Sequence, residues 1–283
     1  MTEPAAGSLF VVSTPIGNMG DFSFRAVEVL KSVALVLAED TRHSRHLLDR
    51  YDIATPMASY HEHNEAKTAG RLVERLLGGE SLALISDAGT PLVSDPGARL
   101  VRAAIDAGVA VIPIPGASAA LSALVASGLD TDRFLFLGFV PRTGRERREV
   151  LSEIAASRHT TIVYESPNRL ADTLGELERL DGGARPAVVA REMTKQFEDI
   201  RRGTLAELRA YYEEHPARGE VVLVIAGATD RVVGEEEIAE KVRALRAAGM
   251  SARDASARAA AELGVSKRVA YRLARNGSGE TEE

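Results

Sequence analysis

Short runs of apolar and β-branched residues recur along the chain as far as Gly227, and each is followed by a segment with helical spacing. Most of the runs lack alternation, which is typical of strands that helices cover on both faces. The pattern therefore predicts an α/β protein with largely parallel sheets. The expected strands are Leu9–Thr14, Ala34–Asp40, Ser81–Asp87, Ala110–Pro115, Phe134–Phe139, Thr160–Ser166, Pro186–Glu192 and Glu220–Gly227.

Turn residues suggest that these strands form two domains rather than one large sheet. Pro113, Pro115 and Gly116 interrupt the chain near the middle of the pattern. A charged segment, Pro141–Arg148, follows the first strand of the second half. We expect one α/β domain at residues 1–116 and another at residues 117–228.

The pattern after Gly227 changes to helices alone, so residues 229–283 are expected to form a separate all-helical appendage. Ser251 and Ser266 each precede a helical pattern, and the short spacing between the two helices is similar to that of a helix-turn-helix. Arg268, Arg272 and Arg275 share one face of the last helix. This face is either an ordinary solvated surface or a surface that binds nucleic acid.

The charge of the chain differs between the appendage and the body. The net charge is −6, but residues 241–276 carry nine basic and two acidic side chains, while residues 1–240 carry a net −10. A basic arm on an acidic body indicates that the two parts of the chain have different tasks. A second group of exposed cations, Arg142, Arg145, Arg147 and Arg148, could also contact phosphates.

Composition excludes several kinds of site. The 283 residues include no cysteine, which removes disulfides, thiolate metal sites and cysteine nucleophiles, and suits a reducing cytoplasm. No lysine or arginine precedes Arg25, and no apolar run is long enough to cross a bilayer. His61 and His63 have a spacing found in metal sites, but they alternate in an extended chain, so no metal is expected.

Familiar nucleotide and hydrolase motifs are missing, whereas Gly/Pro turns follow several expected strands. The chain has no G-x-G-x-x-G after a strand, no G-x-x-x-x-G-K-[ST] and no G-x-S-x-G. Turns follow the strands at Thr14–Asn18, at Asp87–Pro91 with Ser94–Gly97 just after, and at Pro115–Ser118. Glycine allows a ligand to approach the backbone, and ligands bind at the carboxyl ends of strands in such sheets. These turns therefore predict a binding site at one edge of the first sheet.

An ordered series of motifs resembles the ribosomal RNA branch of the tetrapyrrole methylase superfamily. The motifs are Ser13-Thr-Pro-Ile-Gly-Asn18, Ala38-Glu-Asp-Thr-Arg42, Tyr60-His-Glu-His-Asn-Glu65, Ser86-Asp-Ala-Gly-Thr-Pro91, Ser94-Asp-Pro-Gly97, Pro113-Ile-Pro-Gly-Ala-Ser118, Tyr164-Glu-Ser166 and Ala190-Arg-Glu-Met-Thr-Lys195. The resemblance extends from about Leu9 to Gly227. Ser86 and Ala88 depart from the Gly-Asp-Pro loop of the superfamily, and this departure argues against a porphyrin substrate.

The resemblance implies two α/β domains with S-adenosylmethionine in the cleft between them, and a homodimer. It also implies methylation of the ribose 2′-oxygen of a decoding-region cytidine in 16S ribosomal RNA, within the 30S subunit. The residues that it assigns to the cofactor are Pro15, Ile16, Gly17, Asp87, Ala88, Gly89, Thr90, Pro91, Gly116, Ser118, Ala119, Tyr164, Ala190 and Val224.

Methylation of a hydroxyl requires removal of its proton, which a carboxylate or a lysine of lowered pKa can perform. Glu165, Glu192 and Lys195 are the candidates, because all three lie at the ends of expected strands, and Arg191 could hold a phosphate. Each could instead form a structural ion pair. Two other functions remain open: a methyltransferase for a tetrapyrrole-like small molecule, and a non-catalytic regulator that binds nucleic acid.

Overall fold

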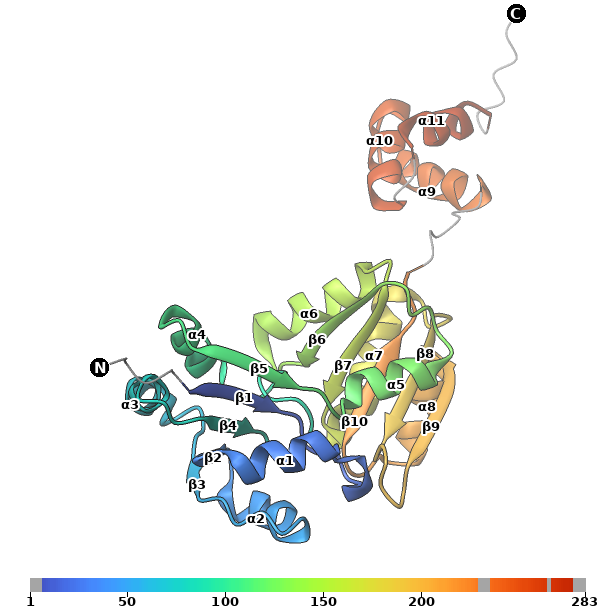
Figure 1. The fold of residues 1–283 in the computed structure, drawn as a ribbon. Coiled ribbons are helices and arrows are strands. Elements are labelled where there is room, and N and C mark those ends of the chain that lie inside the picture. The colour runs from blue at the N-terminus through green and yellow to red at the C-terminus, as the bar shows by residue number, and fades with distance from the viewer. Residues whose placement is uncertain (1–6, 229–234, 264–265, 277–283) are drawn as a thin grey trace, which may run out of the picture. The chain divides into compact units, whose positions relative to one another are not determined.

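Five parallel strands form the first sheet, as the unbroken apolar runs predict (Figure 1). The computed structural model describes residues 7–228, 235–263 and 266–276. The strand order is β3-β2-β4-β1-β5. The elements of this half are β1 (Ser8–Val12), η1 (Met19–Asp21), α1 (Phe24–Ser32), β2 (Leu35–Ala38), α2 (Thr41–Arg50), β3 (Met57–Ser59), α3 (Glu65–Leu77), β4 (Leu82–Ile85), α4 (Ala98–Asp106) and β5 (Ala110–Ile114).

Both faces of this sheet are covered by helices, which explains why its strands are apolar at successive positions. In β4, Leu82 and Leu84 pack in one cluster, which includes Leu72 of α3 and Leu100 of α4. The alternate residues Ala83 and Ile85 pack in another cluster with side chains of α1 and α2. Since all parallel strands point the same way, the loops that follow β1, β4 and β5 lie at one edge.

The second sheet is mixed, so the expectation of largely parallel sheets is wrong for this half. Its order is β6-β7-β10-β8-β9, and only the β6–β7 pair is parallel. An apolar run indicates that a strand is buried on both faces. Antiparallel strands covered by helices are buried in this way too, so the run does not determine the strand direction. The elements are α5 (Ala119–Ser127), β6 (Phe134–Phe139), α6 (Gly144–Ala156), β7 (Thr160–Glu165), η2 (Pro167–Arg169), α7 (Leu170–Asp181), β8 (Pro186–Arg191), β9 (Asp199–Thr204), α8 (Leu205–Glu214) and β10 (Val221–Ile225).

All eight expected strands are present, and two further strands were not expected. The segment β3 has three residues and β9 reads Asp-Ile-Arg-Arg-Gly-Thr, so neither shows an apolar run. β9 lies at an edge of its sheet, where polar side chains are tolerated because one side of the strand has no partner strand.

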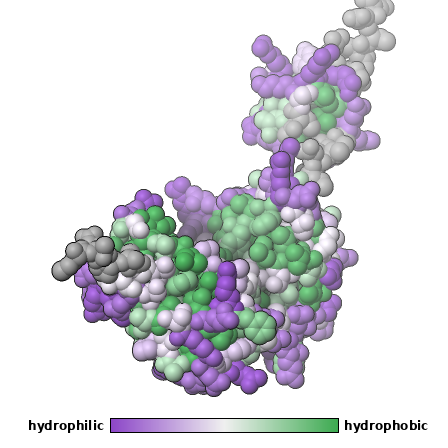
Figure 2. Space-filling view, in the orientation of Figure 1, coloured by the Kyte–Doolittle hydropathy of each residue, from purple (hydrophilic) through white to green (hydrophobic). Residues whose placement is uncertain are grey.

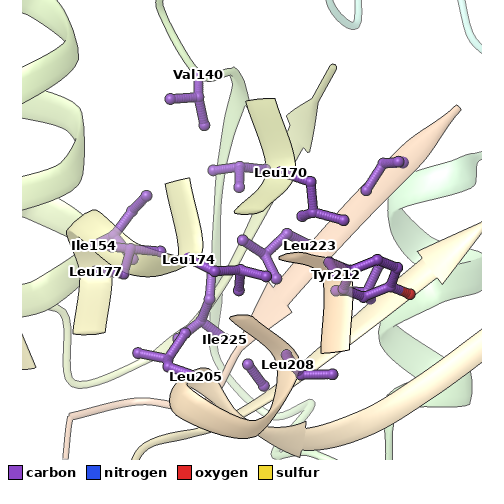
Figure 3. Close-up of a cluster of buried hydrophobic side chains, with 14 of the residues drawn as sticks. Val140, Ile154, Leu170, Leu174, Leu177, Leu205, Leu208, Tyr212, Leu223 and Ile225 are labelled. Carbon is purple, nitrogen blue, oxygen red and sulfur yellow. The ribbon is translucent and has the colours of Figure 1, made fainter. Parts of the chain in front are cut away.

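Helices also cover both faces of the second sheet. Leu174 and Leu177 of α7, Leu205 and Leu208 of α8, and Leu223 of β10 belong to one buried cluster (Figure 3). On the opposite face, α5 packs through Ala120, Ala123 and Leu124 against buried residues of β7, β8 and β10. The chain therefore leaves the first sheet between β5 and α5.

Residues 1–228 form one compact unit that contains both sheets, and residues 229–283 form another. The division of the larger unit at residues 116 and 117 stays a prediction, consistent with the passage of the chain from β5 to α5. In this unit Ser118 caps α5 by accepting the Leu121 N–H at 3.4 Å.

The smaller unit contains α9 (Glu235–Ala247), α10 (Ala252–Leu263) and α11 (Lys267–Asn276). Ser251 and Asp254 begin α10 as a cap, because the Ser251 hydroxyl accepts the Asp254 N–H and donates to its carboxylate. Ile238, Ala260 and Ala270 come from the three helices and form a small buried cluster with Leu273. No helix in the described part of the chain is long and apolar enough to cross a membrane.

Candidate active site

A cavity of about 360 Å³ lies where the segments that follow β1, β4, β5 and β7 meet the end of β6 and the start of β10. The start of β10 lies beside the end of β7, because the two strands are antiparallel and Val221 pairs with Glu165. The lining residues are Ile16, Asp87, Ala88, Gly89, Thr90, Val93, Ser94, Asp95, Ser118, Ala119, Phe139, Tyr164, Glu165, Ser166, Pro167, Gly219, Glu220, Val221 and Val222.

The turns expected at the edge of the first sheet do come together. Thr14 and Gly89 exchange backbone hydrogen bonds of 2.8 and 3.1 Å, and the hydroxyls of Ser13 and Thr90 are 3.0 Å apart. Gly89 has a φ of +85°, a conformation that suits glycine. A Cβ on Gly116 would lie 2.9 Å from that of Ser13, so a side chain there would displace the first turn.

Eight of the fourteen residues expected at the cofactor line this cavity: Ile16, Asp87, Ala88, Gly89, Thr90, Ser118, Ala119 and Tyr164. Pro15, Gly17, Pro91 and Gly116 belong to the same turns without lining it. Ala190 and Val224 were expected to face the cleft, but both are fully buried in the cluster that α5 covers. The face of the sheet that carries these two residues is covered by α5, so neither side chain reaches the cavity.

Glu165 lies at the end of β7, but its carboxylate is committed to structural contacts. One oxygen accepts the Ser166 N–H at 2.6 Å and lies 2.6 Å from an Arg169 nitrogen. The other accepts the Thr173 hydroxyl at 2.6 Å and lies 3.6 Å from Arg147. The side chain is inaccessible to solvent, so this arrangement favours the structural ion pair over a catalytic base.

Glu192 and Lys195 form a cluster beside the cavity rather than in its lining. The Lys195 ammonium lies 3.0 Å from Glu192 and 3.1 Å from Glu220. Burial opposes the charge of Lys195, but these hydrogen bonds outweigh burial and raise its pKa. The Glu220 N–H and then Lys195 lower the pKa of Glu192. Lys195 is therefore a protonated lysine paired with two carboxylates. Its pKa is raised, whereas the sequence led us to expect a lysine of lowered pKa.

The loop of Glu192 and Lys195 connects the two halves of the larger unit. Glu192 and Thr194 both have positive φ, and the Thr194 hydroxyl accepts the Asn18 N–H at 3.2 Å. A Cβ on Gly17 would lie 2.4 Å from the Lys195 side chain. Arg191 donates to the Arg218 carbonyl at 3.3 Å. The contacts of Thr194 and Lys195 with Asn18 and Gly17 position the first turn against the second sheet.

The structure adds Asp95 and Glu220 to the acidic groups of the cavity. Burial, then the charge of Glu39, raises the pKa of Asp95 to about 6, against which a hydrogen bond from Ser86 acts. The Ser94-Asp-Pro-Gly97 turn was among those expected where a ligand binds, but Asp95 itself was not among the expected site residues. Among the described residues that line it, none is Lys, Arg or His.

The expected phosphate-binding arginines have different surroundings. Arg142 and Arg148 are exposed, and Arg145 is exposed in an ion pair with Glu149. Arg147 is buried between Glu176 and Glu165, so its expected role as a phosphate contact is wrong. Arg142 lines a second cavity of about 270 Å³ with Arg169, Arg179 and Arg209 among its other residues.

In the smaller unit, Arg268 and Arg272 are exposed on α11. Arg272 forms a 2.6 Å ion pair with Glu235 of α9, which offsets part of its charge. The side chain of Arg275 lies outside the described residues. A group of three or more His, Asp or Glu side chains that could hold a metal ion is not found in the described segments.

The fold is that of a family of methyltransferases. A family model of tetrapyrrole (corrin/porphyrin) methylases matches residues 8–209, so the chain belongs to the tetrapyrrole methylase family. A solved uroporphyrin-III C-methyltransferase from Thermus thermophilus, in complex with S-adenyl homocysteine, shares this fold. It has a TM-score of 0.55 and 21% identity, and the match covers 78% of this chain and 97% of that one.

Two relatives from bacteria match nearly the whole chain, and both are named ribosomal RNA small subunit methyltransferase I. The relative from Synechocystis is 47% identical over 94% of this chain and 97% of its own length. That from Pseudomonas aeruginosa is 48% identical over 95% of this chain and 97% of its own. The matched length includes most of the basic appendage as well as both sheets.

Proposed function

We propose that this chain transfers a methyl group from S-adenosylmethionine to the ribose 2′-hydroxyl of a decoding-region cytidine in 16S ribosomal RNA, within the 30S subunit. One observation carries the proposal: a cavity lined by carboxylates but by no described basic side chain, in a chain related along its length to ribosomal RNA methyltransferases. The cytoplasm, where ribosomes are assembled, is the corresponding location.

The residues of the cavity fit the cofactor. S-adenosylmethionine supplies a methyl group on a positively charged sulfur, which leaves readily. Asp87, Asp95 and Glu220 give the cavity a negative potential that favours a cation and disfavours phosphate. Tyr164 and Phe139, whose rings lie 5.2 Å apart, add an aromatic surface. Ile16, Asp87–Thr90, Ser118 and Ala119 are the residues that would hold the cofactor.

The RNA would be held outside this cavity, where the arginines lie. Arg142 and Arg148 are exposed near α6, and Arg268 and Arg272 are exposed on α11. Each phosphate contact releases condensed counterions, so binding through these residues weakens with salt. Separation of a cation-binding cavity from phosphate-binding surfaces would let one acidic protein bind both a sulfonium and a polyanion.

The contribution of the appendage is testable with Arg268→Ala and Arg272→Ala combined. We expect weaker binding to 16S RNA, with the slope of log affinity against log salt reduced by about 1 to 2. Filter binding at four salt concentrations measures both quantities. The matched control, Arg99→Ala with Arg102→Ala on the exposed side of α4, should change neither. Unchanged RNA affinity in the α11 variant would remove the appendage from the RNA-binding surface.

A homodimer through α5 is part of the proposal. Apolar side chains lie on all sides of α5, although only one face of the helix packs against the second sheet. Leu121 and Val125 on the other face are 49% and 75% exposed, and Phe134 of β6 is 44% exposed. Figure 2 shows hydrophobic surface gathered over this part of the molecule. An apolar area of this kind suits contact with a second copy.

Leu121→Glu with Val125→Glu should therefore convert the dimer to a monomer, because two carboxylates would lose hydration at the interface. Sedimentation equilibrium should give half the mass of the unsubstituted protein. Ile105→Glu, at an exposed site on α4, serves as the control and should remain dimeric. A monomeric unsubstituted protein would contradict the dimer.

Methyl transfer to RNA separates the proposal from its alternatives. Assembled 30S subunits, naked 16S RNA and a porphyrin precursor would each be incubated with labelled S-adenosylmethionine. The proposal predicts label in RNA alone, with 30S subunits the better substrate. Label in the porphyrin precursor would support the small-molecule enzyme. Cofactor binding without transfer would support the non-catalytic regulator.

A further inference from the structure

The second cavity, of about 270 Å³, lies outside the candidate active site and is lined by residues of α7, of α8 and of the segment that begins α6. Three of its lining residues are carboxylates, and five are arginines, for which we name it the arginine cavity. Its lining is therefore net positive, although the chain has a net charge of −6. The arginines are Arg142, Arg147, Arg169, Arg179 and Arg209.

Two of the three carboxylates are already paired within the lining. Glu176 lies 2.8 Å from Arg147, and Glu213 lies 3.3 Å from Arg209. The third carboxylate, Asp172, is exposed. Because the paired charges offset one another, the excess of positive charge comes from the other three arginines.

These three arginines have hydrogen-bond donors that no protein group uses. Arg142 and Arg179 are exposed, and within the described segments neither side chain forms an ion pair. Arg169 contacts Glu165 through one terminal nitrogen at 2.6 Å, but its other terminal nitrogen is buried without a hydrogen-bond partner. A buried donor without a partner costs free energy, which an anion in the cavity would partly offset. Since guanidinium groups bind phosphate through pairs of parallel hydrogen bonds, the lining suits a phosphate group.

Gly175 provides space in the arginine cavity. It lies in the interior of α7, where glycine is less favourable than alanine, and it lines the cavity. A Cβ at this position would lie 3.3 Å from Cδ of Arg209 and 3.6 Å from Nη1 of Arg179. A larger side chain would therefore fill the space between α7 and these two arginines.

The arginine cavity is close to the candidate active site along two segments of the chain. Phe139 lines the active site, and Arg142, three residues later, lines the arginine cavity. Pro167 and Arg169 line the same two cavities and are two residues apart. Three residues span at most about 11 Å, and two span about 7 Å. Because a stacked strand of nucleic acid advances about 3.4 Å per nucleotide, one strand could reach both cavities within a few nucleotides.

We propose that the arginine cavity binds a backbone phosphate of the RNA strand that carries the methylated ribose. This inference rests on the proposed function, because an RNA substrate is what brings a phosphodiester close to the active site. Contacts to phosphates fix the register of a nucleic acid on a protein without reading its sequence. The arginine cavity therefore helps to select which ribose reaches the methyl group, while the acidic active-site cavity remains available to the cofactor.

Arg142→Ala combined with Arg179→Ala tests the charge of the site. Both side chains are exposed, so the fold should be unchanged. We expect affinity for 16S RNA to fall by about tenfold, with the slope of log affinity against log salt reduced by about 1 to 2. Affinity for S-adenosylmethionine, measured by calorimetry, should stay within about twofold. The matched control is Arg50→Ala with Arg71→Ala, at exposed sites on α2 and α3, and it should change neither affinity.

Gly175→Leu tests the cavity itself, because it changes no charge. The leucine side chain would fill the space that the phosphate needs, so affinity for 16S RNA should again fall by about tenfold. Attraction to surface arginines alone would not be affected by this substitution. The matched control is Gly70→Leu in α3, where a Cβ meets nothing within 4 Å. Circular dichroism checks that both glycine variants fold, and the arginine pair decides the test if Gly175→Leu does not.

Chemical modification of arginine distinguishes an RNA phosphate from a free phosphate ion. Phenylglyoxal reacts with exposed guanidinium groups, and peptide mass spectrometry gives the extent of reaction at each arginine. We expect 16S RNA to protect Arg142 and Arg179, while inorganic phosphate at the same concentration of phosphate groups protects neither. Arg50 and Arg71 should react equally in all samples.

Three results would overturn the inference. They are normal RNA affinity in the arginine pair or in folded Gly175→Leu, full reactivity of Arg142 and Arg179 in the RNA complex, or equal protection by inorganic phosphate. The last result would make the cavity a site for a free anion. The proposed function fails separately, if the unsubstituted protein transfers no methyl group to RNA. Normal methyl transfer together with any of the three results overturns the inference alone.

Discussion

Ala119→Trp should abolish cofactor binding while leaving the protein folded. Ala119 is the first residue of α5 and lines the cavity next to Ser118. An indole is among the largest side chains, so at this position it would occupy space in a cavity of about 360 Å³. The small alanine is therefore required for ligand entry. We expect affinity for S-adenosylmethionine to fall by about 100-fold or more, which corresponds to about 2.7 kcal/mol.

Calorimetry with S-adenosylmethionine measures this loss directly. The matched control is Ala98→Trp, because Ala98 is the first residue of α4 and is exposed. It should bind the cofactor as the unsubstituted protein does, and circular dichroism of both variants should be unchanged. Normal cofactor affinity in Ala119→Trp would place the cofactor outside this cavity.

Glu165→Ala should be strongly destabilising. Its carboxylate, with no exposed area, lies against Arg147, whose side chain is 9% exposed, and against Arg169. Removal of the carboxylate leaves two guanidinium groups without their buried partner. Breaking a buried pair in this way costs about 3 to 5 kcal/mol. Urea denaturation should show a loss of this size in the free energy of unfolding.

The control for this prediction is Glu149→Ala, which breaks the exposed pair with Arg145 and should change stability by about 0.5 kcal/mol or less. The comparison also decides between the two roles considered for Glu165. A Glu165→Ala variant with normal stability and no methyl transfer would restore Glu165 as the catalytic base.

Apolar patterning predicted most of the fold. The eight apolar strands and the helical appendage are present, because each depends on local periodicity and burial. The strand directions of the second sheet were not predictable in this way. The chain passes from β8 to β9 by a short loop and returns in β10 antiparallel to β8, which depends on long-range pairing. The polar β9 gave no apolar signal at all.

The candidate site could likewise be predicted where it depends on local backbone conformation, but not where it depends on long-range contacts. Glycine and proline turns predicted the cavity edge formed by Asp87–Thr90 and Ser118, because these turns need local backbone conformations. The state of a charged side chain depends on partners distant in sequence. Arg147 meets Glu176 across two helices, and Lys195 meets Glu220 from the start of β10. Asp95 was recognised as a residue of the cavity only when its burial and its neighbours were known.

The most direct test of the central claim is to identify the methylated atom. Small-subunit RNA would be methylated by the purified protein with labelled S-adenosylmethionine, digested to nucleosides, and analysed by mass spectrometry, with nuclease resistance to locate the position. The proposed function predicts one labelled product, 2′-O-methylcytidine, from a single decoding-region position. A methyl group on a base, label on several unrelated nucleotides, or no label in RNA would contradict it.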